Sequence, residues 1–192
     1  MTTTARPDKA ELRRQALARR ATADLSTGAA LRDAVLALPE LSTATCVTAY
    51  VARMAEPDTA PLIDELHRRG TRVLLPVLLP DLDLDWAPDD GERHRSSVHR
   101  GLTEPTGTPL GRDAIAEADV VLAPALAVDR SGVRLGYGGG CYDRALTRIR
   151  PGTLVVALLH EGELRDEPLP AEDHDRRVDA VALPSGVVRI AP

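Results

Sequence analysis

The sequence predicts an α/β protein of three layers, in which helices flank a mainly parallel sheet. Two observations indicate this class. Short apolar runs rich in β-branched residues alternate along the chain with segments whose apolar residues follow the 3.6-residue period of a helix. Strands and helices that alternate in this way usually form a parallel sheet with helices packed on its faces. Because no internal repeat or low-complexity linker divides the 192 residues, we expect one domain over residues 1–192.

Helices are predicted from apolar spacing and from the residues that begin and end them. Asp8 can cap the first helix, whereas Pro39 and Gly70 end the second and third. The predicted helices are Asp8–Arg20, Ser26–Leu38, Ala60–Arg69, Asp113–Ala118 and Tyr142–Arg148.

Strands are predicted where apolar, β-branched runs are bounded by turn residues. Two polar segments without a clear period, Ala87–Pro109 and Leu169–Arg177, are predicted as loops. The predicted strands are Cys46–Ala52, Arg72–Leu79, Leu82–Trp86, Val120–Val128, Thr153–Leu159 and Asp179–Pro184.

The composition excludes several functional classes. A net charge of −5 without a basic stripe interleaved with aromatic residues argues against a nucleic-acid binder. No apolar stretch approaches the ~18 residues that span a membrane, and the N-terminus is too polar for a signal peptide. Cys46 and Cys141 lie far apart and lack the spacing of metal ligands. We therefore expect a soluble, cytoplasmic monomer that acts on small molecules.

The segment Gly132–Arg144 reads GVRLGYGGGCYDR and lies between a predicted strand and a predicted helix. We name its centre, Gly136–Gly140, the glycine loop. Glycine lets backbone N–H groups approach an anion, and a helix N-terminus adds partial positive charge. The loop matches neither GxxxxGK[ST] nor GxGxxG. A structural turn that binds nothing therefore remains an alternative, but the flanking Arg134, Asp143 and Arg144 favour a nucleotide phosphate site, with Asp143 indicating Mg²⁺.

The N-terminal helix carries a second candidate anion site. All but one of the 24 basic side chains are Arg, and the exception is Lys9. Lys offers a compact, mobile charge that suits a phosphate, whereas Arg presents a rigid fork. Lys9 and Arg13 are four residues apart and so share a helix face. They form either a phosphate clamp or a solvated basic face.

Two acidic residues are candidates elsewhere. Glu56 follows a predicted strand, and ligands of open α/β sheets gather beyond the carboxyl ends of the strands. It can accept N–H donors from a heterocycle or cap the next helix, but Asp58 and Thr59 are better placed to cap. Asp175 could be a second Mg²⁺ ligand if folding brings it to Asp143.

Taken in order, these motifs resemble those of the 5-formyltetrahydrofolate cyclo-ligase family, also called 5,10-methenyltetrahydrofolate synthetases. The matching segments are KAELR from Lys9, EPDT from Glu56, GLTEP, APALAVD, the glycine-rich segment and HDRRVD. The resemblance implies a fold related to ribose-phosphate isomerases and CoA transferases. It also implies an enzyme that uses ATP and Mg²⁺ to convert 5-formyltetrahydrofolate to 5,10-methenyltetrahydrofolate, with release of ADP and phosphate.

The resemblance further implies roles for individual residues. Catalytic roles fall to Lys9, Arg134, Tyr142 and Asp143. ATP would be bound by these four together with Arg13, Gly136, Tyr137, Gly138, Gly139, Gly140 and Arg144. The folate would be bound by Val51, Met54, Glu56, Gly139, Gly140 and Cys141. Mg²⁺ would be held by Asp143 and Asp175.

One departure from the family pattern leaves alternatives open. Cys141 stands where the family usually has an aromatic residue near the folate, and a lost stacking surface could cost about 1 kcal/mol of binding. The chain could therefore be a divergent relative that uses ATP and Mg²⁺ on another substrate. It could also be a non-catalytic regulator that binds folate, although such a protein has no need of a phosphate clamp.

Overall fold

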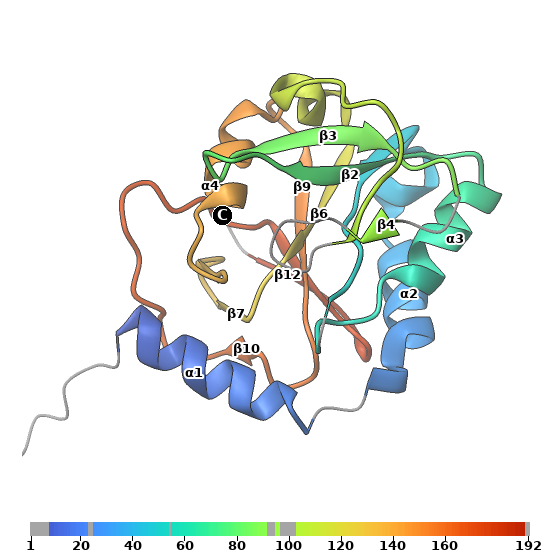
Figure 1. Cartoon of the computed structure of the whole chain (residues 1–192). Coiled ribbons are helices and arrows are strands. Elements are labelled where there is room, and N and C mark those ends of the chain that lie inside the picture. The colour runs from blue at the N-terminus through green and yellow to red at the C-terminus, as the bar shows by residue number, and fades with distance from the viewer. Residues whose placement is uncertain (1–7, 23–24, 54, 92–94, 97–102, 191–192) are drawn as a thin grey trace, which may run out of the picture.

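A seven-stranded sheet runs through the centre of the molecule (Figure 1). The computed structural model describes residues 8–22, 25–53, 55–91, 95–96 and 103–190. The inner strands pair in parallel, and each edge strand pairs antiparallel with its neighbour. The predicted, mainly parallel sheet is confirmed. In spatial order the strands are β12 (Gly186–Arg189), β11 (Ala180–Leu183), β9 (Leu154–Leu158), β6 (Val120–Pro124), β1 (Cys46–Thr48), β2 (Arg72–Leu78) and β3 (Leu84–Pro88).

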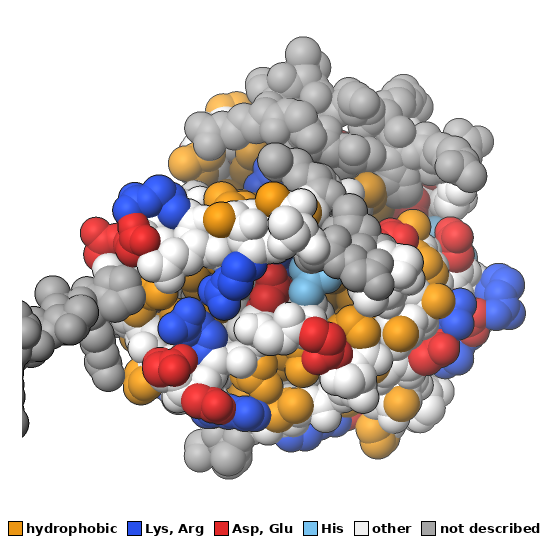
Figure 2. Space-filling view, turned by 90° about the horizontal axis from the view of Figure 1, so that it is seen from below, with side chains coloured by type: hydrophobic (Ala, Val, Ile, Leu, Met, Phe, Trp, Pro, Cys, Tyr) orange, Lys and Arg blue, Asp and Glu red, His pale blue; other side chains and the backbone are white. Residues whose placement is uncertain are grey.

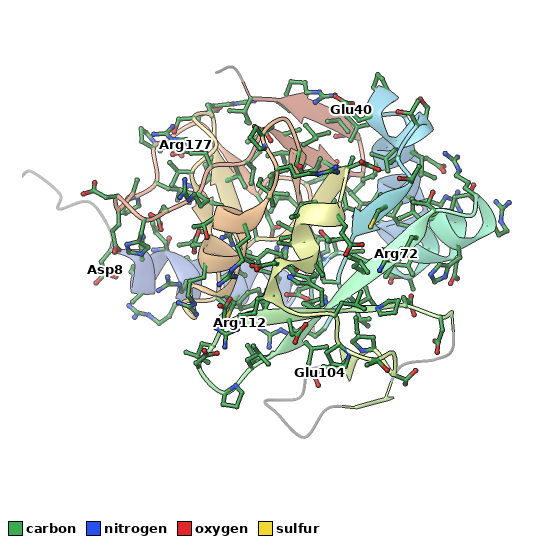
Figure 3. All side chains as sticks on the ribbon, turned by 90° about the horizontal axis from the view of Figure 1, so that it is seen from above. Asp8, Glu40, Arg72, Glu104, Arg112 and Arg177 are labelled. Atoms are coloured by element: carbon green, nitrogen blue, oxygen red, sulfur yellow. The ribbon has the colours of Figure 1, made fainter. Side chains whose placement is uncertain are left out.

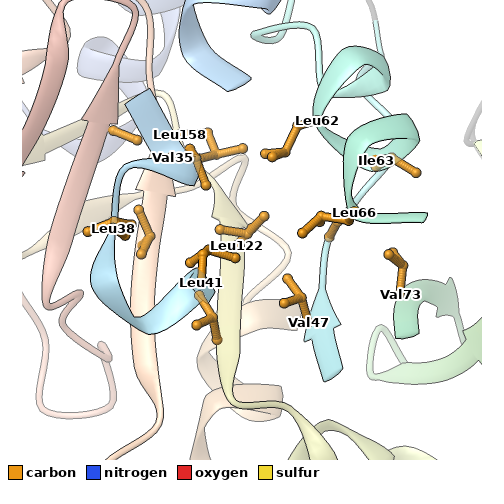
Figure 4. Packing of buried hydrophobic residues seen from close by; sticks show 14 of the residues in the cluster. Val35, Leu38, Leu41, Val47, Leu62, Ile63, Leu66, Val73, Leu122 and Leu158 are labelled. Carbon is orange, nitrogen blue, oxygen red and sulfur yellow. The ribbon is translucent and has the colours of Figure 1, made fainter. Parts of the chain in front are cut away.

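Helices cover both faces of this sheet. Alternate side chains of the inner strands point to opposite sides, so each face carries its own set of apolar side chains that must be buried. One set packs under α2 (Gly28–Leu36) and α3 (Ala60–Arg68), as the neighbouring Val47, Leu66 and Leu122 show in Figure 4. The other set packs against η3 (Arg112–Glu117), α4 (Cys141–Ala145) and η4 (Leu146–Arg148). The three layers are therefore confirmed, and both cores are mainly aliphatic.

The helix predictions are confirmed with shorter bounds. In α1 (Lys9–Arg20), the Asp8 carboxylate caps the first turn by accepting a hydrogen bond from the Glu11 amide at 2.7 Å. Asp8 lies at the outer end of this helix, and Glu40 and Arg177 lie near the upper edge of the view in Figure 3. The predicted second helix, Ser26–Leu38, is divided into η1 (Leu25–Thr27) and α2, and a separate 3₁₀ turn, η2 (Pro39–Ser42), begins at Pro39, the residue predicted to end that helix. The last two predicted helices are a 3₁₀ turn, η3, and the short pair α4 and η4.

The prediction of one strand over Val120–Val128 is wrong. β6 ends at Pro124, and the chain then enters a second sheet of order β10 (Leu164–Arg165), β7 (Ala127–Asp129) and β8 (Arg134–Leu135). Beyond the break, the Leu126 amide donates to the Leu135 carbonyl at 2.8 Å. The apolar run continues through the break because every residue between is at least partly buried, so hydropathy gives no sign of it.

The first helix packs against this second sheet rather than against the large one. Leu12 and Ala16 of α1 form a core with Leu126, Val133 and Leu135. Figure 1 shows α1 beside β10 and β7 at the bottom of the view, away from α2 and α3. Lys9 and Arg13 are thereby carried to the glycine loop, which follows β8.

The polar segment Ala87–Pro109 is only partly described. β3 continues to Pro88, and β4 (Arg95–Ser96) pairs antiparallel with β5 (Thr103–Glu104). The other predicted loop, Leu169–Arg177, contains no helix or strand in the structure, which describes all of it. Among the described residues, no helix is both long and apolar enough to cross a membrane.

Candidate active site

A cavity of about 950 Å³ opens where α1, the glycine loop and the loop after β1 meet. It lies beyond the carboxyl ends of β1, β2 and β6, where ligands of α/β sheets usually bind. The structure brings most of the predicted site residues to its wall. Those that line it are Lys9, Arg13, Val51, Glu56, Arg134, Gly136, Tyr137, Gly138, Gly139, Gly140, Cys141, Tyr142, Asp143 and Asp175.

The glycine loop, Gly136–Gly140, lines the cavity along its whole length. Gly138 has a φ of +101°, and a side chain there would also press on the Arg13 guanidinium, with Cβ 3.3 Å from Cζ. Arg13 Nε donates to the Gly136 carbonyl at 2.9 Å. Arg13 therefore supports the loop backbone. The helix after the loop is shorter than the sequence predicts, so its dipole adds less positive charge than a long helix would.

Arg134 and Asp143 flank the glycine loop and form a partly buried ion pair. Arg134 Nη2 donates to Asp143 Oδ1 at 2.8 Å, and the Arg134 guanidinium lies 5.8 Å from the centre of the Tyr142 ring. Arg134 Nε is buried and has no hydrogen-bond partner among the described residues. The Tyr142 hydroxyl is likewise without a described partner, while its ring meets Trp86 edge-on with centroids 6.3 Å apart. Unpaired buried donors beside a cavity fit a polar ligand.

Lys9 faces the loop before β11. Its Nζ donates to Asp175 Oδ2 at 2.8 Å and to Glu172 Oε1 at 2.9 Å. Burial opposes the charged form of Lys9, but the hydrogen bonds to Asp175 and Glu172 outweigh it and raise the pKa of the amine. Lys9 is therefore a cation at the cavity wall, already paired with two carboxylates.

The two predicted Mg²⁺ ligands come from adjoining segments. The Arg176 amide donates to Asp143 Oδ1 at 3.3 Å, which joins the chain beside Asp175 to Asp143. Among the described residues there is no group of three or more His, Cys, Asp and Glu that could hold a metal ion. Two carboxylates fit a Mg²⁺ ion that takes its remaining ligands from phosphate and water. They do not fit a metal held by protein ligands alone.

Glu56 lines the cavity from the loop after β1 and is only 6% exposed. Its Oε2 accepts a hydrogen bond from the Arg53 amide at 2.9 Å. Burial raises the pKa of Glu56, and the hydrogen bonds from the Arg53 amide and the Tyr137 hydroxyl offset part of this rise. As predicted, Asp58 rather than Glu56 bonds the first turn of α3, through the Ala60 amide at 3.0 Å.

Two predicted residues, Met54 and Arg144, are not placed on the cavity wall, whereas Cys141 is. Met54 lies outside the described residues. Arg144 is not among the described residues that line the cavity, and its Nη2 instead donates to the carbonyls of Leu82 and Gly139. Cys141 lines the cavity and is half-buried. Arg144 therefore ties the glycine loop to the turn before β3.

The chain matches the model of the 5-formyltetrahydrofolate cyclo-ligase family over residues 5–184. It belongs to this family. A 5-formyltetrahydrofolate cyclo-ligase of Mycolicibacterium smegmatis is 42% identical over 154 residues, which are 75% of this chain and 76% of the relative. The Escherichia coli K12 cyclo-ligase is 35% identical over 183 residues, or 91% of this chain and 96% of the relative. The resemblance identified from the sequence motifs is confirmed.

Solved structures agree with this assignment. The NMR structure of an Aquifex aeolicus 5,10-methenyltetrahydrofolate synthetase superposes with a TM-score of 0.80 at 25% identity, over 96% of this chain and 93% of that one. A synthetase from Mycoplasma pneumoniae gives a TM-score of 0.72 at 17% identity, over 92% and 98%, which supports the fold alone. The predicted fold class is thus also that of solved cyclo-ligase relatives.

Sequence reasoning missed two residues of this cyclo-ligase cavity. Tyr50 follows β1, and its buried hydroxyl has no hydrogen-bond partner among the described residues. Arg53 stacks over the Tyr137 ring, with Cζ 4.7 Å from the centroid. Both lie just beyond the strand that led to Glu56, so position at a strand's carboxyl end was the signal that could have found them.

Proposed function

We propose that the protein is a 5-formyltetrahydrofolate cyclo-ligase that converts 5-formyltetrahydrofolate and ATP into 5,10-methenyltetrahydrofolate, ADP and phosphate. Membership of the family supports the activity. The observation that carries the proposal is that one cavity has two chemically different walls. The nucleotide wall consists of Lys9, Arg134 and the glycine loop, and the folate wall consists of Tyr50, Val51 and Glu56.

The reaction needs phosphoryl transfer because the formyl group is a poor electrophile. The formyl nitrogen donates electrons into the carbonyl, which weakens attack on its carbon. Transfer of the γ-phosphoryl group of ATP to the formyl oxygen gives an iminium phosphate and ADP. N10 of the folate then attacks the carbon and gives up its proton, the C–O bond breaks, and phosphate leaves with that proton as the ring closes. The protein supplies orientation and charge rather than a nucleophile, so Cys141 needs no nucleophilic role.

The nucleotide wall is suited to hold phosphates. In this proposal Lys9 exchanges Glu172 for a phosphate oxygen, since Glu172 is 56% exposed and can turn into solvent. Arg134 is held by Asp143 and still has its Nε to donate. The backbone N–H groups of the glycine loop complete the wall. Mg²⁺, held by Asp143 and Asp175 together with phosphate oxygens, would supply neutralising charge.

The folate wall is suited to a heterocycle with N–H donors. The Glu56 carboxylate is fixed by the Arg53 amide and retains acceptor capacity, because an ionised carboxylate offers about four lone-pair sites. The Tyr50 hydroxyl adds a group without a described partner. Val51 lines the same wall and offers apolar contact. We propose that Glu56 accepts hydrogen bonds from the pterin ring.

Surface charge is consistent with a small-molecule enzyme. On the face drawn in Figure 2, Lys and Arg side chains lie beside Asp and Glu side chains, and the described residues form no continuous basic stripe there. A nucleic-acid groove usually has such a stripe.

The test is the near-ultraviolet absorbance of the methenyl product. The protein is mixed with 5-formyltetrahydrofolate, ATP and Mg²⁺, and matched samples omit ATP or the folate. We expect the product absorbance to rise only in the complete mixture, with ADP formed in step. A folate-binding regulator would bind the folate without product or ADP. ADP formation with another formylated compound, but not with this folate, would favour the divergent relative.

A further inference from the structure

Arg20 is a buried arginine at the end of α1, only 3% exposed, although its neighbour Arg19 is exposed. Its Nε and Nη2 donate to the two oxygens of Glu163, each at 2.7 Å. Nη2 also donates to the Ala125 carbonyl at 2.5 Å. A two-pronged pair of this kind fixes the plane of the guanidinium and therefore the direction of its remaining N–H groups.

One of those remaining groups points to the glycine loop. Arg20 Nη1 donates to the Tyr137 hydroxyl at 2.9 Å. Because a guanidinium has no acceptor, the Tyr137 oxygen must accept this bond, and its own proton is left to donate elsewhere. Tyr137 and Glu56 line the same cavity and share Arg53, whose Cζ lies 4.7 Å from the Tyr137 ring centroid and whose Nε lies 3.8 Å from Glu56 Oε1. Hydrogen bonding from the Tyr137 hydroxyl lowers the pKa of Glu56, which as a carboxylate can only accept. The donors therefore run in one direction, from Arg20 through Tyr137 to Glu56.

Glu163 is also connected, through hydrogen bonds of His160, to the backbone of the residue before Glu56. Its Oε2 accepts a hydrogen bond from the His160 amide at 2.9 Å. The His160 ring in turn places Nε2 3.0 Å from the Ala55 carbonyl, in the residue before Glu56. Arg20, Glu163 and His160 are not among the described residues that line the cavity. They act on the folate wall through Tyr137, through the backbone of the loop after β1 and through the charge of Arg20, which lowers the pKa of Glu56.

We propose that Arg20 and Glu163 are positioning residues for the folate site, which direct the Tyr137 hydroxyl proton to Glu56 and so hold the Glu56 carboxylate ready for the substrate. This inference rests on the proposed function, in which Glu56 binds the pterin ring. It joins the two walls, because Tyr137 belongs to the glycine loop. A correctly formed glycine loop would then be required for a correctly oriented Glu56.

A purely structural pair would tie α1 to the second sheet without affecting the titration of Glu56, so pH distinguishes the two roles. Removing the Tyr137 bond or the Arg20 charge should raise the pKa of Glu56 further, because both lower it at present. As pH is lowered, these variants should then lose folate affinity at a higher pH than the unmodified protein does. The charged and titratable groups that face Glu56 are Arg53, Arg20, Tyr137, Tyr50 and Tyr142.

The experiment is a double-mutant cycle read by calorimetric binding of 5-formyltetrahydrofolate without ATP, at several pH values. Tyr137→Phe removes the hydroxyl and keeps the ring. The pair Arg20→Gln with Glu163→Gln removes both charges, so neither is left buried alone. The third member combines these changes, and Arg19→Gln is the control on the exposed face of the same helix. Tyr137→Phe leaves the ion pair intact, so it tests the relay even if the neutral pair fails to fold.

We expect Tyr137→Phe and the neutral pair each to weaken folate binding by about tenfold, as for loss of a hydrogen bond to a charged group. Because the Arg20 charge also acts on Glu56 directly, the combined variant should be weaker than either, but by clearly less than the sum of the two free-energy losses. The loss of folate affinity at low pH should begin at a higher pH in each of these variants, but not in Arg19→Gln. The positioning role would be overturned if the free-energy losses were additive. It would also be overturned if the fall of folate affinity at low pH began at the same pH in Tyr137→Phe as in the wild-type protein, which still binds the folate. Wild-type protein that does not bind the folate would overturn the proposed function and this inference together.

Discussion

The two walls of the cavity hold their charged groups in different ways. On the nucleotide wall, Lys9 is paired with Asp175 and with Glu172, which is exposed and whose bond solvent can replace. On the folate wall, Glu56 is buried, and its contacts with the Arg53 amide and with Tyr137 come from within the cavity wall. On the nucleotide wall, Lys9 can therefore replace its bond to Glu172 with a bond to the ligand. On the folate wall, Glu56 is already held in place before the ligand binds. Preorganised groups lose little freedom when a ligand binds.

The largest expected effect is on the nucleotide wall. Lys9→Ala should lower kcat/KM for ATP by about 10²–10³-fold, the range found when one charge-stabilising donor is removed from an active site. The affinity for 5-formyltetrahydrofolate should stay unchanged, because Lys9 is hydrogen-bonded to Asp175 and Glu172 and not to a residue of the folate wall. Steady-state kinetics and folate calorimetry measure the two quantities. Arg14→Ala, an exposed change on the same helix, is the control, and equal ATP kinetics in both variants would remove Lys9 from the site.

The next effect concerns the folate wall. Glu56→Gln should weaken folate binding by about 10- to 100-fold, because an amide replaces a charged acceptor, while KM for ATP changes little. Calorimetry and initial rates measure this split. Glu161→Gln, at an exposed glutamate, serves as the matched control. A variant that loses ATP and folate affinity equally would contradict the separation of the walls.

The folate wall should also respond to pH. Because burial raises the pKa of Glu56, its carboxylate takes a proton at a higher pH than an ordinary carboxyl, and folate affinity should fall as pH drops through that value. In the folded protein the raised pKa disfavours ionisation, so the contribution of Glu56 to stability is lost as pH rises through it. Glu56→Gln should abolish this limb of the binding profile without lowering the free energy of unfolding at neutral pH. Binding titrations and urea unfolding across pH test both statements.

The smallest expected effect is a lower KM for ATP, caused by a change at Glu172. Glu172→Gln removes a charge that competes for Lys9, so KM for ATP should fall by a few fold while folate affinity is unchanged. The effect should shrink at high salt because the pair is exposed on one side. Glu167→Gln, an exposed glutamate in the same loop region, is the control. A raised KM in Glu172→Gln would mean that Glu172 helps to hold the nucleotide instead.

The helices, the inner strands and the glycine loop could be predicted from patterns of neighbouring residues. Contacts between residues far apart in the sequence could not. The glycine loop, α1 and the inner strands each depend on neighbouring residues, so their patterns were readable. The contact of Lys9 with Asp175 and the pairing of Arg20 with Glu163 join residues more than a hundred positions apart. The second sheet was missed because its strands are two or three residues long, too short for any period.

The central claim is that both walls act in one reaction, in which the formyl oxygen leaves as part of phosphate. The direct measurement uses 5-formyltetrahydrofolate labelled with ¹⁸O in the formyl group, together with ATP and Mg²⁺, and determines the mass of the phosphate released. We expect the label to appear in the phosphate as the methenyl product forms. Unlabelled phosphate alongside product would contradict it, because ATP would then be cleaved without phosphorylation of the formyl oxygen.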